Sequence, residues 1–68
     1  MFQLKIIDQH HNAELFRLFY KTRLGAMRVG SRLIDGNNAN YRAEVWKSGV
    51  LLLRKLSNNK WQQQSKYE

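Results

Sequence analysis

A two-residue turn signal constrains the fold of this chain more than any other feature. Ser48–Gly49 lies between residues 41–47, in which apolar and polar side chains alternate, and a second expected strand over residues 50–57, which begins with the apolar run Val50–Leu53. Alternation with a period of two is typical of β-strands, and a two-residue loop that contains glycine joins antiparallel strands. The segment therefore predicts a β-hairpin.

Further stretches extend this hairpin into a sheet. Residues 2–7 alternate, and residues 27–35 alternate between apolar and basic side chains. Asn58–Asn59 is a second tight-turn candidate, because asparagine tolerates a positive φ, and it precedes a strand over residues 60–67. The expected cross-strand pairs are Lys47 with Val50, Val45 with Leu52, Tyr41 with Leu56, Ser57 with Lys60 and Leu56 with Trp61.

Residues 13–24 change to a helical period. Their apolar side chains form one wide stripe, and Glu14, Arg17 and Lys21 lie on the opposite face. Asn12 fits the N-cap, and Gly25 lies where a glycine commonly ends a helix. Residues 26–35 stay open between strand and continued helix, and the strand is favoured because a glycine inside a helix costs about 1 kcal/mol.

The predicted fold is α+β, with a single helix on a mostly antiparallel sheet of four to five strands in the order β-α-β-β-β-β. The 68 residues predict one small basic domain over residues 1–68. No cysteine is present, so no disulfide contributes to its stability. A winged-helix relative, with residues 44–56 as the wing, is the alternative, and it requires a helix over residues 27–33.

Charge is the main indication of function. Twelve lysines and arginines face five acidic residues, which gives a formal net charge of +7 and a pI near 10.3. Self-repulsion destabilises such a chain unless an anionic partner relieves it, and nucleic acid is a common partner of this kind. We therefore expect a non-enzymatic nucleic-acid-binding module, and the sequence does not distinguish DNA from RNA, or one strand from two.

The expected binding surface is the sheet face that the helix leaves open. Basic side chains would contact phosphates there, and a tryptophan would stack on a base. Because phosphate contacts carry no sequence information, we expect a weak sequence preference. The predicted nucleic-acid-binding residues are Arg28, Arg32, Arg42, Trp46, Lys55 and Lys66.

The alternative function is a protein-interaction module that uses Trp46, Leu51 and Leu53 as a hydrophobic patch, since tryptophan is enriched at such sites. Small basic cysteine-free chains of this build resemble phage or plasmid accessory proteins in a general way, without a shared motif. Such a module would be an inhibitor or adaptor of a larger nucleic-acid machine. A homodimer through the same face is a variant of this hypothesis.

Sequence motifs for catalysis are missing. His10 and His11 have no cysteine and few carboxylates to complete a metal site. No phosphate-binding loop and no nucleophile–base spacing is present. We therefore expect that the protein is not an enzyme and that it binds no cofactor and no metal. The apolar runs are too short for a membrane span or a signal peptide, which predicts a cytoplasmic protein with no membrane partner.

Overall fold

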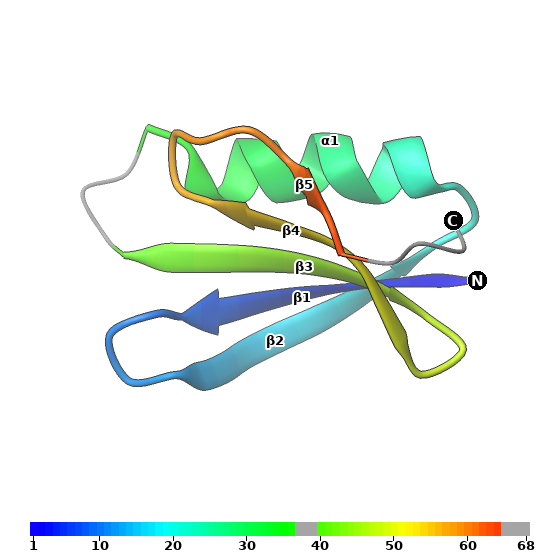
Figure 1. Cartoon of the computed structure of the whole chain (residues 1–68), viewed down its shortest axis with the longest axis horizontal. Helices are drawn as coiled ribbons and strands as arrows, with labels where there is room; N and C mark the ends of the chain where they lie inside the picture. Colours follow the sequence, from blue (N-terminus) through cyan, green and yellow to red (C-terminus); the bar gives the residue numbers. More distant parts are fainter. Residues whose placement is uncertain (37–39, 65–68) are drawn as a thin grey trace.

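The computed structural model describes residues 1–36 and 40–64, and it shows one helix packed on one face of a five-stranded antiparallel sheet (Figure 1). The sheet order is β2-β1-β3-β4-β5. The elements are β1 (Phe2–Asp8), β2 (Ala13–Tyr20), α1 (Arg23–Ile34), β3 (Tyr41–Lys47), β4 (Val50–Leu56) and β5 (Gln62–Gln63). The predicted α+β class, with a single helix on an antiparallel sheet, is confirmed.

The chain order of the second and third elements differs from the prediction. The order is β-β-α-β-β-β, because residues 13–20 form a strand and residues 23–34 form the helix. The helix was expected over residues 13–24 and a strand over residues 27–35. The structure has a strand in the first segment and the helix in the second. The reasons lie in the side chains that each element exposes and buries.

Strand β2 has apolar side chains on both faces. Leu18 pairs with the buried Leu4 and points to the helix side, whereas Phe19 pairs with Gln3 and points to the other side. A bulge leaves Leu15 without a partner on β1 and interrupts the alternation. A strand of this composition lacks a clean period of two, so a helical stripe describes its sequence equally well.

Helix α1 begins one turn before Ala26 and buries small residues. Thr22 is its N-cap, and the hydroxyl of Thr22 accepts the N–H of Gly25 at 3.0 Å, so Gly25 belongs to the first turn of the helix. Ala26, Gly30 and Ile34 are buried at four-residue spacing. A Cβ on Gly30 would lie 3.0 Å from both Leu4 and Trp61, so this close contact requires glycine despite its low helix propensity.

The core lies between α1 and the central strands. Its largest fully buried side chains are Leu4, Ile34 and Val45. The predicted pairing of Lys47 with Val50 is confirmed, but a bulge then places Leu53 opposite Val45, where Leu52 was expected. Beyond this bulge every β4 side chain is shifted by one position, which moves it to the other face of the sheet.

The shift also changes the expected pairs further along. Leu56 pairs with Arg42, where Tyr41 was expected. Strand β5 is only two residues long and pairs Gln62 with Arg54 and Gln63 with Leu53, so Trp61 does not pair with Leu56 as predicted. Residues 65–67 of the expected last strand lie outside the described part of the chain.

Candidate nucleic-acid interface

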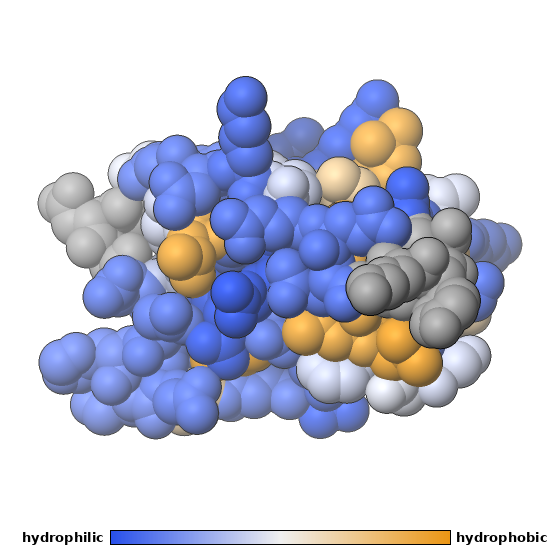
Figure 2. Space-filling model, in the orientation of Figure 1, coloured by the Kyte–Doolittle hydropathy of each residue, from blue (hydrophilic) through white to orange (hydrophobic). Residues whose placement is uncertain are grey.

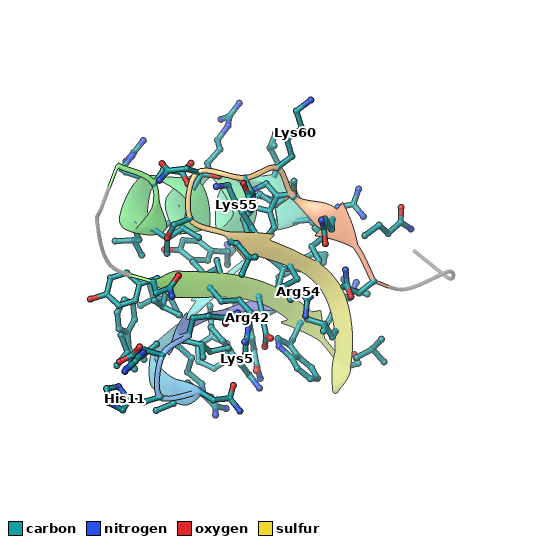
Figure 3. All side chains as sticks on the ribbon, turned by 60° about the vertical axis from the view of Figure 1, so that its left-hand side comes forward. Lys5, His11, Arg42, Arg54, Lys55 and Lys60 are labelled. Atoms are coloured by element: carbon teal, nitrogen blue, oxygen red, sulfur yellow. The ribbon has the colours of Figure 1, made fainter. Side chains whose placement is uncertain are left out.

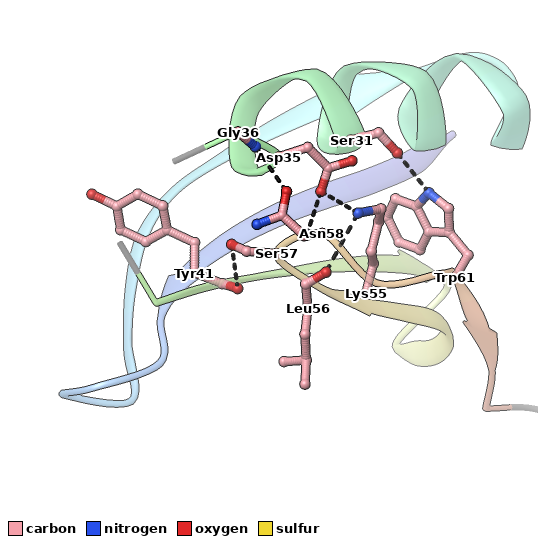
Figure 4. A network of polar contacts seen from close by, with 9 residues as sticks. All are labelled: Ser31, Asp35, Gly36, Tyr41, Lys55, Leu56, Ser57, Asn58 and Trp61. Carbon is pink, nitrogen blue, oxygen red and sulfur yellow. Dashed lines mark hydrogen bonds and ion pairs between the residues drawn. The ribbon is translucent and has the colours of Figure 1, made fainter. Parts of the chain in front are cut away.

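Lys55, expected on the open sheet face, lies on the helix side instead. It is 4% exposed and pairs with Ala43 across the strands. Its ammonium group donates to the carboxylate of Asp35, the C-cap residue of α1, which also accepts the N–H of Asn58 at 2.7 Å (Figure 4). These hydrogen bonds, from Lys55 first and Asn58 second, lower the pKa of Asp35. Lys55 therefore fastens β4 to the end of α1 and is not available to a phosphate.

The three residues of the expected hydrophobic patch do not lie together. Trp46 and Leu51 are cross-strand neighbours on the open face, as predicted, and both are half-buried. Leu53 is 6% exposed and belongs to the core on the helix side, because the β4 bulge turned it inward. The patch on the open face therefore reduces to two partly covered side chains.

Glu44 is the centre of the open face. Its carboxylate accepts the Arg42 Nε–H at 2.9 Å and the Trp46 indole N–H at 2.9 Å. Lys5 and Arg54 are its cross-strand neighbours on β1 and β4, so their side chains lie beside it. The Lys5 ammonium group lies 4.1 Å from the centre of the Trp46 ring. The indole of Trp46 is thus bonded at its N–H and covered by a cation.

Arg42 has further partners within the chain. Its guanidinium group donates to the side-chain oxygens of Gln9 and Asn12 in the β1–β2 turn, in addition to Glu44. Figure 3 shows Arg42, Lys5 and Arg54 away from the helix, on the same part of the sheet. Arg42 was expected to contact phosphate, but its hydrogen-bonding groups hold the turn to the sheet.

The helix side carries two arginines, Arg28 and Arg32, whose surroundings differ from those of Arg42. Arg28 and Arg32 are one turn apart on α1, and both are exposed. Neither forms an ion pair with any residue in the described ranges 1–36 and 40–64. Like charges at this spacing repel by about 0.2–0.5 kcal/mol, and α1 contains no acidic residue to offset them. Both arginines were expected on the open sheet face, which is wrong, because residues 23–34 form the helix and the two side chains are exposed on α1.

An open hollow lies beside these arginines. Its volume is about 380 Å³, and it is lined by Leu24, Met27, Arg28, Ser31, Arg32 and Trp61. The indole N–H of Trp61 donates to the Ser31 hydroxyl at 3.0 Å, which holds the half-buried ring against the helix (Figure 4). The sequence analysis gave Trp61 only a cross-strand pairing with Leu56 and no binding role, whereas the structure packs it against the core beside the helix.

A further cation lies on the helix side of the molecule. Lys60, which precedes Trp61, lies on the helix side of the molecule (Figure 3). Figure 2 shows that the visible face is largely hydrophilic, with hydrophobic side chains in small separate patches. Lys66, the remaining predicted contact residue, lies outside the described residues.

Groups for other chemistry are sparse in the part of the chain that the structure describes. No group of three histidine or acidic side chains there could hold a metal ion. His11 instead bonds the carboxylate of Asp8 at 2.9 Å, and this hydrogen bond lowers the pKa of Asp8. Within the same residues, no helix is long and apolar enough to cross a membrane.

Comparison with known proteins assigns no relative. No family model matches the chain, and no curated protein and no solved structure is significantly similar to it.

Proposed function

We propose that the protein is a non-enzymatic nucleic-acid-binding module whose contact surface is the outer side of α1 together with Trp61. The observation that carries this proposal is the pair of exposed arginines, Arg28 and Arg32, which form no ion pair with residues 1–36 and 40–64 and lie beside a half-buried indole. This surface replaces the open sheet face that the sequence favoured. Lys60 adds a further cation on the same side.

The distribution of acidic groups supports this choice of surface. The carboxylates of Asp8, Glu14, Asp35 and Glu44 each have a partner, respectively His11, Arg17, Lys55 and Arg42. Two of these pairs, those of Glu14 and Glu44, lie on the open face of the sheet. Among the described residues, none of these four carboxylates pairs with Arg28 or Arg32 of α1.

The chemistry of the hollow fits a single-stranded ligand. Guanidinium groups bind phosphate through paired hydrogen bonds, and their binding releases counterions from the backbone. An indole offers a stacking surface that accepts any base. Because a base must leave its duplex stack to reach a ring held against a helix, single-stranded DNA or RNA is the expected form, with a weak sequence preference.

The first test compares two double variants of equal net charge. In Arg28→Gln/Arg32→Gln the helix arginines are removed, and in Lys47→Gln/Arg54→Gln two sheet cations are removed. We expect the helix variant to lose about tenfold or more in affinity for a labelled oligonucleotide, and its salt slope to fall by about 1.4, because two phosphate contacts on a single strand are lost. Fluorescence anisotropy at low and moderate salt measures both. Equal losses in the two variants, or an affinity that does not depend on salt, would contradict the proposal.

The second test uses the two tryptophans. Trp46→Phe leaves Trp61 as the only indole, and Trp61→Phe leaves Trp46. We expect an oligonucleotide to quench the emission of the Trp46→Phe protein and to leave that of the Trp61→Phe protein nearly unchanged. The opposite result would return the site to the open face.

A further inference from the structure

Strand β2 forms one edge of the sheet, and no other strand of the described residues pairs with its outer side. It is eight residues long, contains no proline, and is exposed at every position except Tyr20. A long edge strand presents a row of unpaired N–H and C=O groups that can pair with another strand. The opposite edge, β5, has only two residues and offers no comparable row.

Apolar side chains dominate the β2 edge. Leu15 is 49% exposed, Phe16 43%, Leu18 36% and Phe19 54%. These side chains lie on both faces of β2, with Phe16 and Leu18 on the helix side and Phe19 on the other side, so a strand added at this edge would meet apolar neighbours on both of its faces.

The charges on β2 do not protect this edge. Its only ionised side chains, Glu14 and Arg17, bond each other at 2.7 and 3.0 Å. The strand is therefore neutral within a chain of net charge +7. Natural edge strands often prevent pairing with lysine or proline, and β2 contains neither; its bulge at Leu15 lies outside the regular stretch Phe16–Tyr20.

The side-chain pattern of β2 favours a second copy of the same strand. Beyond the bulge at Leu15, the regular part is Phe16–Tyr20, and Leu18 is its middle residue. A two-fold axis at Leu18 places Phe16 opposite the partner's Tyr20 and Arg17 opposite the partner's Phe19. These are an aromatic pair and a cation–aromatic pair, both of which are favourable across strands.

Neighbouring registers are worse. An axis at Arg17 would set two guanidinium groups opposite each other, and an axis at Phe19 would set Arg17 opposite the partner's Lys21. Like charges in direct opposition are destabilising. Avoidance of like-charge opposition therefore favours the axis at Leu18 over the two neighbouring axes.

We propose that two copies of this chain associate through antiparallel pairing of β2 with β2, about a two-fold axis at Leu18, to form one continuous ten-stranded sheet. Such an axis is perpendicular to the sheet, so both helices lie on the same side of it. The proposal is independent of nucleic-acid binding, since it concerns the free protein.

The oligomeric state of the full chain tests the proposal directly. Sedimentation velocity over a concentration series, at a salt concentration that screens the net charge, should show a species of twice the 8.1 kDa chain mass. Leu18→Lys places two ammonium groups on the axis and should give the mass of one chain. Leu24→Lys makes the same change at an exposed helix residue outside the interface, and should leave the dimer intact. A single-chain mass for the unmodified protein at every concentration would overturn the proposal, and a strand from another protein would then be the occupant of the edge.

Cysteine cross-linking tests the register without a large change in side-chain volume. Leu18→Cys brings two cysteines directly opposite, with Cα atoms about 4.5–5.5 Å apart, within the range of a disulfide. Phe16→Cys leaves its two cysteines roughly 14 Å apart, because four residues of strand separate them. The chain has no other cysteine. We expect oxidation to give a covalent dimer of the first variant only, and cross-linking of both or of neither would overturn the register.

Charge variants at Phe19 keep the test valid if a cysteine variant folds poorly. Phe19→Glu faces the partner's Arg17 and should retain the dimer, whereas Phe19→Lys should reduce the dimer fraction by about tenfold, since each copy contributes one repulsive contact. Equal behaviour of the two variants would contradict the proposed pairing. Circular dichroism confirms that each variant retains the fold.

Discussion

The two sides of the sheet each carry a tryptophan among arginines, but only one of these clusters is satisfied within the chain. On the open face, Trp46 donates to Glu44, which also binds Arg42. On the helix side, Trp61 donates to the neutral hydroxyl of Ser31, and the arginines beside it have no carboxylate partner among the described residues.

The difference between these clusters comes from the position of one carboxylate. Glu44 is nearly buried, and its position among Arg42, Lys5 and Arg54 converts a basic patch into a structural network. A basic aromatic cluster without such a carboxylate keeps its cations available to an anionic ligand. Composition alone does not separate the two cases, because both clusters contain the same residue types.

Removing Glu44 should give the largest loss in the free energy of unfolding. It should also make the basic cluster on the open face resemble the one on the helix side. In Glu44→Ala, the half-buried Arg42 loses its ion pair and the Trp46 N–H loses its acceptor. We expect a loss of about 3 kcal/mol in the free energy of unfolding, because an uncompensated charge and an unpaired donor remain. Urea unfolding measures this loss. The matched control is Glu14→Ala, whose ion pair with Arg17 is more exposed, so its loss should be much smaller.

The same Glu44→Ala protein should bind oligonucleotides more tightly than the unmodified chain. Arg42 would then lose its carboxylate partner, and Lys5 and Arg54 would lose their carboxylate neighbour on β3. Unchanged stability and unchanged affinity would show that Glu44 does not control the open face.

The buried ion pair between β4 and α1 should give the next largest effect. Asp35→Asn leaves the buried Lys55 ammonium without its anion and should lower the free energy of unfolding by about 2 kcal/mol. Lys55→Met replaces the cation with an apolar side chain of similar length and should be nearly neutral, since Asp35 then reaches solvent. Thermal and urea unfolding of both variants distinguish these outcomes. Equal losses of stability in the two variants would contradict the expectation that removing the anion costs more than removing the cation.

Local turn chemistry and charge were predictable from the sequence. The Ser48–Gly49 hairpin has the positive φ angles that such a turn requires, 52° and 79°, and it sets the first cross-strand pair correctly. The surface positions of Arg28 and Arg32 also followed from their charge. These features depend on neighbouring residues, which the sequence displays directly.

The remaining features depend on contacts between distant residues. Gly30 looked like a helix breaker, because nothing in the sequence shows that Leu4 and Trp61 pack against it. The β4 bulge at Leu52 reversed the faces of Leu53 and Lys55, and the sequence of Val50–Leu56 does not alternate and so gives no sign of where a bulge lies. Trp61 was missed for the same reason, since its position depends on the register of strands that the bulge shifts.

Gly30→Ala tests the close contact that supports the helix-side cluster. Alanine would favour the helix by about 1 kcal/mol, but its Cβ would meet Leu4 and Trp61 at 3.0 Å. Leu4 is fully buried and cannot move, so Trp61 must shift away from the helix. We expect a net loss of about 1 kcal/mol, together with a change in Trp61 emission in a Trp46→Phe background. A gain in stability with unchanged emission would show that the contact has room for a methyl group.

The pH dependence of stability should give the smallest effect, because the groups concerned are exposed. Hydrogen bonds from Lys55 and Asn58 hold the pKa of Asp35 below its ordinary value of 3.8. A lowered folded pKa means that the unfolded chain binds the proton first, so this contribution is present above about pH 5 and is lost as the pH falls through the folded pKa. The unfolding free energy of the unmodified protein should therefore fall more steeply below pH 4 than that of Asp35→Asn. The difference between the two curves isolates Asp35 from Asp8 and Glu14, whose pKa values are lowered by His11 and Arg17 in both proteins. Parallel curves would show that Lys55 gives no preference for the ionised carboxylate, and the asymmetry between the two sides of the sheet would then rest on Glu44 alone.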